Sequence, residues 1–155
     1  MKKLSLFLIF FATVFSAQIV LSQTKYDTYG NARFGYSISY PSNLVAKGEA
    51  ENGDGQVFEA KDKRAKLTVW GANNALNQSL KEIYNGDLKQ RGKSVTYKTI
   101  GANFYVISGK QNGKIFYQKT MRNSDDTYST FIFEYAESKR LTYDKAAAQI
   151  AKSFK

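Results

Sequence analysis

The stretch FYVISGKQNGKIFYQKTMR (residues 104–122) reads as two β-strands joined by a very short turn. Asn112-Gly113 at its centre suits the positive φ angles of a two-residue hairpin. A further strand is expected on each side, over residues 94–100 before it and residues 128–135 after it. Neighbouring strands joined by short turns predict a mostly antiparallel sheet at the centre of the fold.

Three more strands are expected upstream. In residues 34–41, tyrosine and isoleucine alternate with serine until the single proline of the chain, Pro41, which is typical of a half-buried strand. Residues 56–60 and 65–70 read as a second pair of strands. Residues 47–55 are rich in glycine and acidic side chains and are expected to form a loop.

Two amphipathic helices complete the pattern. Asn77 or Ser79 can cap the first, which Gly92 ends, and Thr142 can cap the second. Their apolar residues recur at helical spacing: Leu80, Ile83, Tyr84 and Leu88 in the first, and Tyr143, Ala147, Ile150 and Phe154 in the second. The expected order is β-β-β-α-β-β-β-β-α, an α+β fold. One domain is expected over residues 34–155, preceded by a polar leader over residues 23–33.

The opening and the close of this domain resemble the Mog1/PsbP-like superfamily. Its members often begin with an aromatic-Gly-aromatic-x-Ile-x-Tyr-Pro stretch, for which residues 34–41 (FGYSISYP) stand here. They usually end on a helix that closes with Ile-x-x-Ser-Phe, as residues 150–154 (IAKSF) do. The resemblance implies an α-β-α sandwich. It implies a binding or assembly factor rather than an enzyme, and it carries over no cofactor and no catalytic residue.

Residues 1–22 have the layout of a secretory signal peptide. Lys2 and Lys3 precede an apolar run, and small residues follow it. Cleavage is expected after Ser22, with Ala17 as the alternative, and retention of the segment as an uncleaved anchor stays open. We therefore expect an exported protein, either periplasmic or extracellular.

The composition excludes several kinds of chemistry. The chain of 155 residues has no His and no Cys, so it lacks Ser-His and Cys-His nucleophile pairs, disulfides and most zinc and copper ligands. Catalysis would depend on carboxylates, Lys, Tyr or Ser-Lys pairs, and no such motif stands out. The sequence therefore predicts a protein that is not an enzyme.

Basic residues outnumber acidic ones by 23 to 13, which gives a formal charge of +10. Such a surface attracts acidic proteins or anionic components of the envelope, whereas export argues against nucleic acid. The expected contact is the basic turn between residues 56–60 and 65–70, with one aromatic residue beyond it. The residues of this predicted contact are Lys61, Lys63, Arg64, Lys66 and Trp70.

Two alternatives remain open. A hydrolase acting on an extracellular polymer would need two facing acids from among Glu49, Glu51, Glu59, Glu134 and Glu137. A peripheral envelope protein would be held on anionic lipid by its charge. The acidic loop at residues 51–55 lacks the pattern of an EF-hand, and Asp125-Asp126 suits an ordinary turn, so no metal site is expected. Trp70 faces away from Leu67 and Val69, and either packs under a helix or lines a surface pocket.

Overall fold

The structure is a computed structural model that describes residues 24–155. The predicted signal peptide, residues 1–22, lies outside the described residues. Within residues 24–155, no helix is both long enough and apolar enough to cross a membrane.

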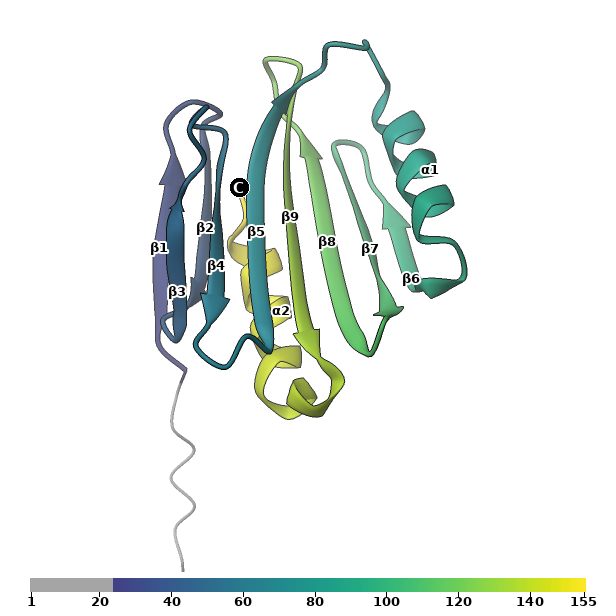
Figure 1. Cartoon of the computed structure of the whole chain (residues 1–155). Coiled ribbons are helices and arrows are strands. Elements are labelled where there is room, and N and C mark those ends of the chain that lie inside the picture. The colour runs from purple at the N-terminus through teal and green to yellow at the C-terminus, as the bar shows by residue number, and fades with distance from the viewer. Residues whose placement is uncertain (1–23) are drawn as a thin grey trace, which may run out of the picture.

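In the described part of the chain, nine strands form two antiparallel sheets (Figure 1). The strands are β1 (Tyr26–Asn31), β2 (Tyr36–Pro41), β3 (Leu44–Glu49), β4 (Gly55–Ala60), β5 (Ala65–Asn73), β6 (Val95–Ile100), β7 (Phe104–Gln111), β8 (Lys114–Arg122) and β9 (Thr127–Ala136). The large sheet has the order β3-β4-β5-β9-β8-β7-β6, and β1 pairs with β2 in a separate two-stranded sheet. The predicted α+β class and antiparallel sheet are confirmed.

The hairpin of β7 and β8 is built as its sequence predicts. Gln111 pairs with Lys114, and the two residues between them, Asn112 and Gly113, have φ angles of 52° and 73°. A right-handed strand twist favours this kind of turn, and asparagine and glycine reach positive φ at the lowest cost. This hairpin fixes the register of the central strands.

Two helices pack on opposite faces of the large sheet. The helix α2 (Arg140–Ser153) shares one core with β1, β2 and the inner faces of β4, β5 and β9. The helix α1 (Leu80–Arg91) lies over β6 and β7 and covers a second, smaller core on the other face, to which β7, β8 and β9 contribute. Short 3₁₀ turns, η1 (Gly92–Ser94) and η2 (Glu137–Lys139), adjoin the helices. The α-β-α layering is therefore present, with the β1–β2 hairpin beside α2 in one outer layer.

The C-terminus is tied to β2. The backbone of Ser37 exchanges two hydrogen bonds with that of Lys155, of 2.7 and 3.1 Å, and the hydroxyl of Ser153 accepts a third from the backbone N–H of Ser39 at 2.9 Å. Because Phe154 and Ile150 are buried in the same core, the closing motif of the sequence anchors the last turn of α2.

Three expectations need correction. The polar leader over residues 23–33 is wrong in part, because β1 forms there and pairs along the whole of β2. The loop expected over residues 47–55 begins only after Glu49, because the edge strand β3 extends to that residue. Both strands were hidden because most of their side chains are exposed, which leaves little apolar alternation. The second helix begins at Arg140 rather than beside Thr142, because η2 leads straight into it.

Candidate functional site

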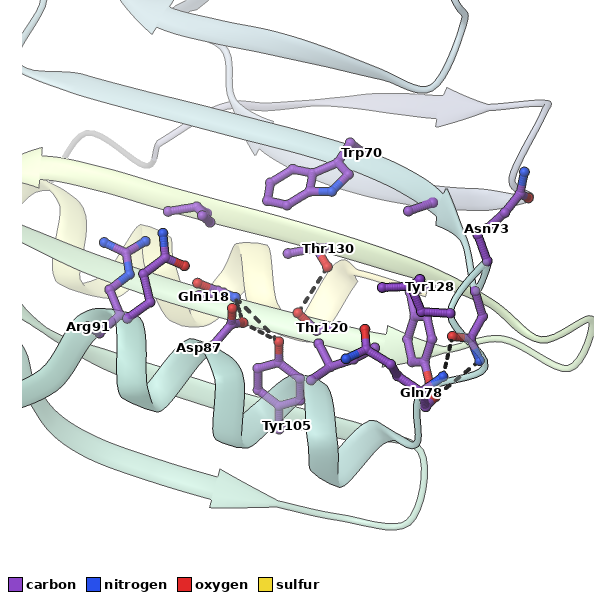
Figure 2. A pocket seen from close by; sticks show the side chains of 17 residues that line it. Trp70, Asn73, Gln78, Asp87, Arg91, Tyr105, Gln118, Thr120, Tyr128 and Thr130 are labelled. Carbon is purple, nitrogen blue, oxygen red and sulfur yellow. Dashed lines mark hydrogen bonds between the residues drawn. The ribbon is translucent and has the colours of Figure 1, made fainter.

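A groove lies between α1 and the large sheet, with a volume of about 620 Å³. Its floor consists of side chains on β5, β8 and β9, its wall is α1, and residues 72–78 close one end (Figure 2). The groove exists because α1 sits over β6 and β7 at the edge of the sheet and leaves the central strands partly uncovered. Small-molecule sites in proteins have roughly this size, about 300–1,000 Å³.

The N-terminus of α1 is fixed by a capping box. The hydroxyl of Ser79 accepts a hydrogen bond from the backbone N–H of Glu82 at 3.2 Å, and the carboxylate of Glu82 accepts one from the backbone N–H of Ser79 at 2.8 Å. The bond from the Ser79 backbone N–H, together with one that the Ser79 hydroxyl donates to the same carboxylate at 2.7 Å, holds the pKa of Glu82 below its ordinary value. The reciprocal pair satisfies N–H groups that have no partner inside the helix. Of the two predicted caps, Ser79 is therefore the one used.

The floor of the groove is polar although it is buried. Strand alternation turns Gln118 and Thr120 of β8 toward the groove and Tyr117 and Lys119 toward the other face. The hydroxyls of Thr120 and Thr130 lie 2.9 Å apart and form a hydrogen bond across β8 and β9. A buried polar group is costly unless it is paired, so this pair stabilises a hydrophilic floor where a sheet face would otherwise be apolar.

A partly buried network closes the inner side of the groove. The carboxylate of Asp87, on α1, accepts hydrogen bonds from the hydroxyl of Tyr105 and the amide of Gln118 (Figure 2). Burial raises the pKa of the Tyr105 hydroxyl, and its bond to Asp87 raises it further. The network therefore keeps Tyr105 protonated and holds α1 at a fixed distance from β7 and β8.

Arg91 lies at the last turn of α1, where cations are favoured by the helix dipole. Its guanidinium donates to the side-chain oxygen of Gln111 at 3.0 Å and stands 4.4 Å from the ring centre of Phe116. Both contacts hold the arginine at one end of the groove, opposite Asn73 (Figure 2).

Trp70 forms the side of the groove that faces α1. It lies on β5 with Lys66 and Thr68, whereas Leu67 and Val69 point into the core on the other face. Its cross-strand partner on β9 is Thr130, so the half-buried indole lies beside the hydroxyl pair of the floor. Of the two expectations for Trp70, the structure therefore gives the pocket rather than packing under a helix.

The predicted contact residues fall into two groups. Lys61, Lys63 and Arg64 are exposed in the turn between β4 and β5, where Asp62 pairs with Lys139 at 3.0 Å. Trp70 lies further along β5, roughly 20 Å from Arg64 at about 3.3 Å per residue. Lys66 lies between them and on the same face as Trp70, with its ammonium 3.6 Å from the carboxylate of Glu134. The turn and the groove are thus separate surfaces of the molecule.

Four of the five acids named for a hydrolase have separate partners. Glu59 pairs with Lys47 at 3.4 Å, Glu134 pairs with Lys66, and Glu137 pairs with Lys110. Glu49 accepts a hydrogen bond of 2.6 Å from the hydroxyl of Tyr29. Each of these carboxylates is thus engaged by a different group.

Oxygen atoms of the acidic loop are also engaged by the protein itself. The carbonyl of Gly53 accepts from the Asn31 amide at 2.9 Å, and that of Asp54 accepts from the Tyr36 hydroxyl at 2.9 Å. At the other turn, Asp126 pairs with Arg122 at 2.6 Å. Within residues 24–155, no cluster of three or more acidic, His or Cys side chains is arranged to hold a metal ion.

The sequence reasoning missed Asp87, Tyr105, Gln118 and Thr130. One signal was available, because Asp87 lies four residues after Ile83 and seven after Leu80, on the apolar stripe of the helix. A carboxylate on that stripe needs a buried donor. The donors could not be identified, because they lie on strands whose pairing depends on the whole sheet.

Comparison with solved structures agrees with this architecture. The chain is similar to the solution structure of cyanobacterial PsbP (CyanoP) from Synechocystis sp. PCC 6803, with a TM-score of 0.61 and 14% sequence identity. The match covers 88% of this chain and 95% of that one. No protein-family profile and no curated protein sequence matches the chain. The chain therefore has a PsbP-like fold.

Proposed function

We propose that the chain is an exported, non-enzymatic binding protein that holds its ligand in the groove between α1 and the large sheet. The observation that carries this proposal is the single tryptophan of the chain, half-buried on a polar floor and facing a helix wall across a groove of about 620 Å³. Apolar surface beside a few fixed polar groups is the usual composition of a ligand site.

The titratable groups of the groove favour binding over catalysis. The charged residues that line it are Asp87 and Arg91. Asp87 already accepts two hydrogen bonds, and Arg91 is held by Gln111 and Phe116. General acid–base catalysis needs a group that can exchange a proton with the substrate, and neither residue is placed for that. Fixed polar groups of this kind orient a ligand instead.

A second contact is proposed at the basic turn between β4 and β5. Lys61, Lys63 and Arg64 are exposed there, and an acidic protein or another anionic component of the envelope is the expected partner. A cluster of exposed cations increases the association rate with an anionic partner, and the effect falls with ionic strength. The turn would then recruit the chain, and the groove would hold the ligand.

The intrinsic fluorescence of Trp70 tests the groove directly, because no other tryptophan contributes to the signal. Purified chain lacking residues 1–22 is titrated with a library of small polar and aromatic compounds, and hits are confirmed by calorimetry. We expect a change in Trp70 emission that saturates, and weaker binding in Gln90→Ala at the groove. Gln149→Ala, exposed on α2 at the other face, is the matched control and should bind normally. Saturable binding unaffected by Gln90→Ala would contradict the proposal.

The basic turn has its own test. The triple variant Lys61→Glu, Lys63→Glu, Arg64→Glu should lose crosslinking to its envelope partner in cells. The control reverses three other exposed lysines, Lys89, Lys145 and Lys152, and changes the net charge by the same amount. Equal losses in both variants would show that only total charge matters.

A further inference from the structure

The groove is electrically balanced, which sets it apart from the rest of the molecule. The whole chain has 23 basic and 13 acidic residues, yet one of each, Arg91 and Asp87, lines the groove. Other charges around the groove neutralise each other in pairs, Lys66 with Glu134 at 3.6 Å and Arg122 with Asp126 at 2.6 Å. A site for an anion would concentrate the excess of basic residues, so the ligand of this groove is selected by something other than charge.

Amide side chains are the main polar groups of the groove. They belong to Asn73, Asn74, Gln78, Gln90 and Gln118. Each amide both donates and accepts hydrogen bonds, as a hydroxyl group does. Gln90 is exposed at the rim, so its amide is accessible to a ligand. Such a lining matches a ligand with many neutral hydroxyl groups.

Trp70 provides the apolar counterpart. Its indole projects over the floor from β5, and Figure 2 shows it across the groove from Asp87 and Arg91 of α1. Indole offers a large flat apolar surface together with one N–H donor. A ring that has one apolar face and a hydroxylated edge would stack on Trp70 and turn its edge toward the amide of Gln90 on α1 and the hydroxyl pair of Thr120 and Thr130.

An extended peptide fits the groove less well. Recognition of a peptide as an added strand requires an open sheet edge. The floor strands β5, β9 and β8 are interior strands, and their backbone groups are already paired on both sides. An amphipathic helix would need an apolar floor, whereas Gln118, Thr120 and Thr130 make this floor polar.

We propose that the groove binds a neutral saccharide, with a sugar ring stacked on Trp70 and its hydroxyl groups turned toward Gln90 and the hydroxyl pair of Thr120 and Thr130. This inference rests on the proposed function, because it names the ligand class of the same site. Three observations carry it together: the balanced charge, the amide-rich lining and the single indole over a hydroxylated floor.

The test uses the chain from residue 23 and a panel of neutral oligosaccharides: chito-, cello-, malto- and manno-oligomers. At least one should shift the emission of Trp70 in a saturable way. Calorimetry should show that Trp70→Ala weakens binding by about tenfold or more, and that Trp70→Phe, which keeps a ring, weakens it less. Because the ligand is neutral, raising NaCl from about 0.05 M to about 0.5 M should leave the affinity unchanged.

The outcomes separate this inference from the proposal beneath it. If no saccharide binds, while a peptide or a charged compound binds saturably at Trp70, the saccharide inference is overturned and the ligand-binding groove stands. If no compound of any class binds, both the saccharide inference and the proposed ligand-binding function are overturned. Saccharide binding that persists in Trp70→Ala, with thermal unfolding showing a folded variant, would move the sugar site elsewhere and also overturn the inference.

Discussion

The hydroxyl of Tyr105, on β7, donates a hydrogen bond to the carboxylate of Asp87, on α1, so a fully buried tyrosine ties the groove wall to the sheet. The Gln118 amide donates to the same carboxylate. The position of α1, and with it the width of the groove, depends on this network in addition to the apolar contacts of Leu80 and Ile83.

Replacing Tyr105 with Phe should lower the free energy of unfolding by about 1.5–3 kcal/mol, the usual value of a hydrogen bond to a charged group. The ring stays in place, so the loss comes from the missing donor to Asp87. Urea denaturation measures it as a lower midpoint with an unchanged slope. Tyr97→Phe is the control, because Tyr97 is 54% exposed and should change stability by less than about 0.5 kcal/mol. Equal effects in the two variants would contradict a structural role for the Tyr105–Asp87 bond.

Elements of this fold could be predicted from the sequence where a local pattern of residues specifies them. The β7–β8 hairpin was predictable because Asn112-Gly113 specifies its turn locally, and both helices were predictable from their apolar stripes. β1 and β3 were not, because their strands are formed by main-chain pairing while most of their side chains face solvent. The groove was predictable only through Trp70. Its other residues come from α1, from residues 72–78 and from β7, β8 and β9. The order of strands in the sheet brings them together, and no local sequence pattern encodes that order.

Asn31 offers a test of β1, the strand that the sequence did not reveal. Its amide donates to the carbonyl of Gly53 at 2.9 Å, and its side-chain oxygen accepts from the backbone N–H of Phe34 at 2.9 Å. Asn31 is 3% exposed, so Asn31→Ala leaves buried groups without partners and should cost about 1–3 kcal/mol. Thr28→Ala, at an exposed position of the same strand, should cost much less. If Asn31→Ala leaves the free energy of unfolding unchanged, residues 26–31 are a dispensable leader after all.

Gly109 should tolerate no side chain. A Cβ built there would lie 1.8 Å from the backbone oxygen of Ser94, so the adjoining start of β6 would have to move. Gly109→Ala is therefore expected to destabilise the fold by about 1–3 kcal/mol, as overpacking does. Gly30→Ala is the matched control, because a Cβ at Gly30 meets nothing within 4 Å. Urea denaturation of the two variants at the same pH should give a lower midpoint for Gly109→Ala. Similar midpoints would disprove the close approach of η1 to β7.

Stability should fall in alkaline solution. Burial, as the largest cause, raises the pKa values of Tyr36, Tyr105 and Tyr135 above their ordinary value. The unfolded chain loses these protons near about pH 10, whereas the native chain still holds them. The stabilisation is therefore complete below about pH 10 and is lost as pH rises toward the native pKa values.

Urea midpoints between about pH 8 and about pH 11 should fall with pH, and tyrosinate absorbance should appear together with unfolding. Tyr36→Phe removes one of the three groups, so its midpoint should fall less steeply, even though the variant also loses the bond from the hydroxyl to the carbonyl of Asp54. A Tyr36→Phe slope equal to that of the parent would rule out a contribution from this tyrosine.

The capping box of α1 should be needed for an ordered groove wall. Ser79→Ala removes the oxygen that accepts from the backbone N–H of Glu82, and losses of such caps cost about 1 kcal/mol. Ser79→Thr keeps the acceptor, so its free energy of unfolding should stay within a few tenths of a kcal/mol of that of the parent. Amide hydrogen exchange gives the sharper measurement, because the first turn of α1 should open faster in Ser79→Ala alone. The helix α2 is the internal reference, since its N-cap residue, Lys139, makes no side-chain capping bond. Faster exchange in both helices would mean that the substitution loosens the whole fold, and would refute a local role for Ser79 at the groove.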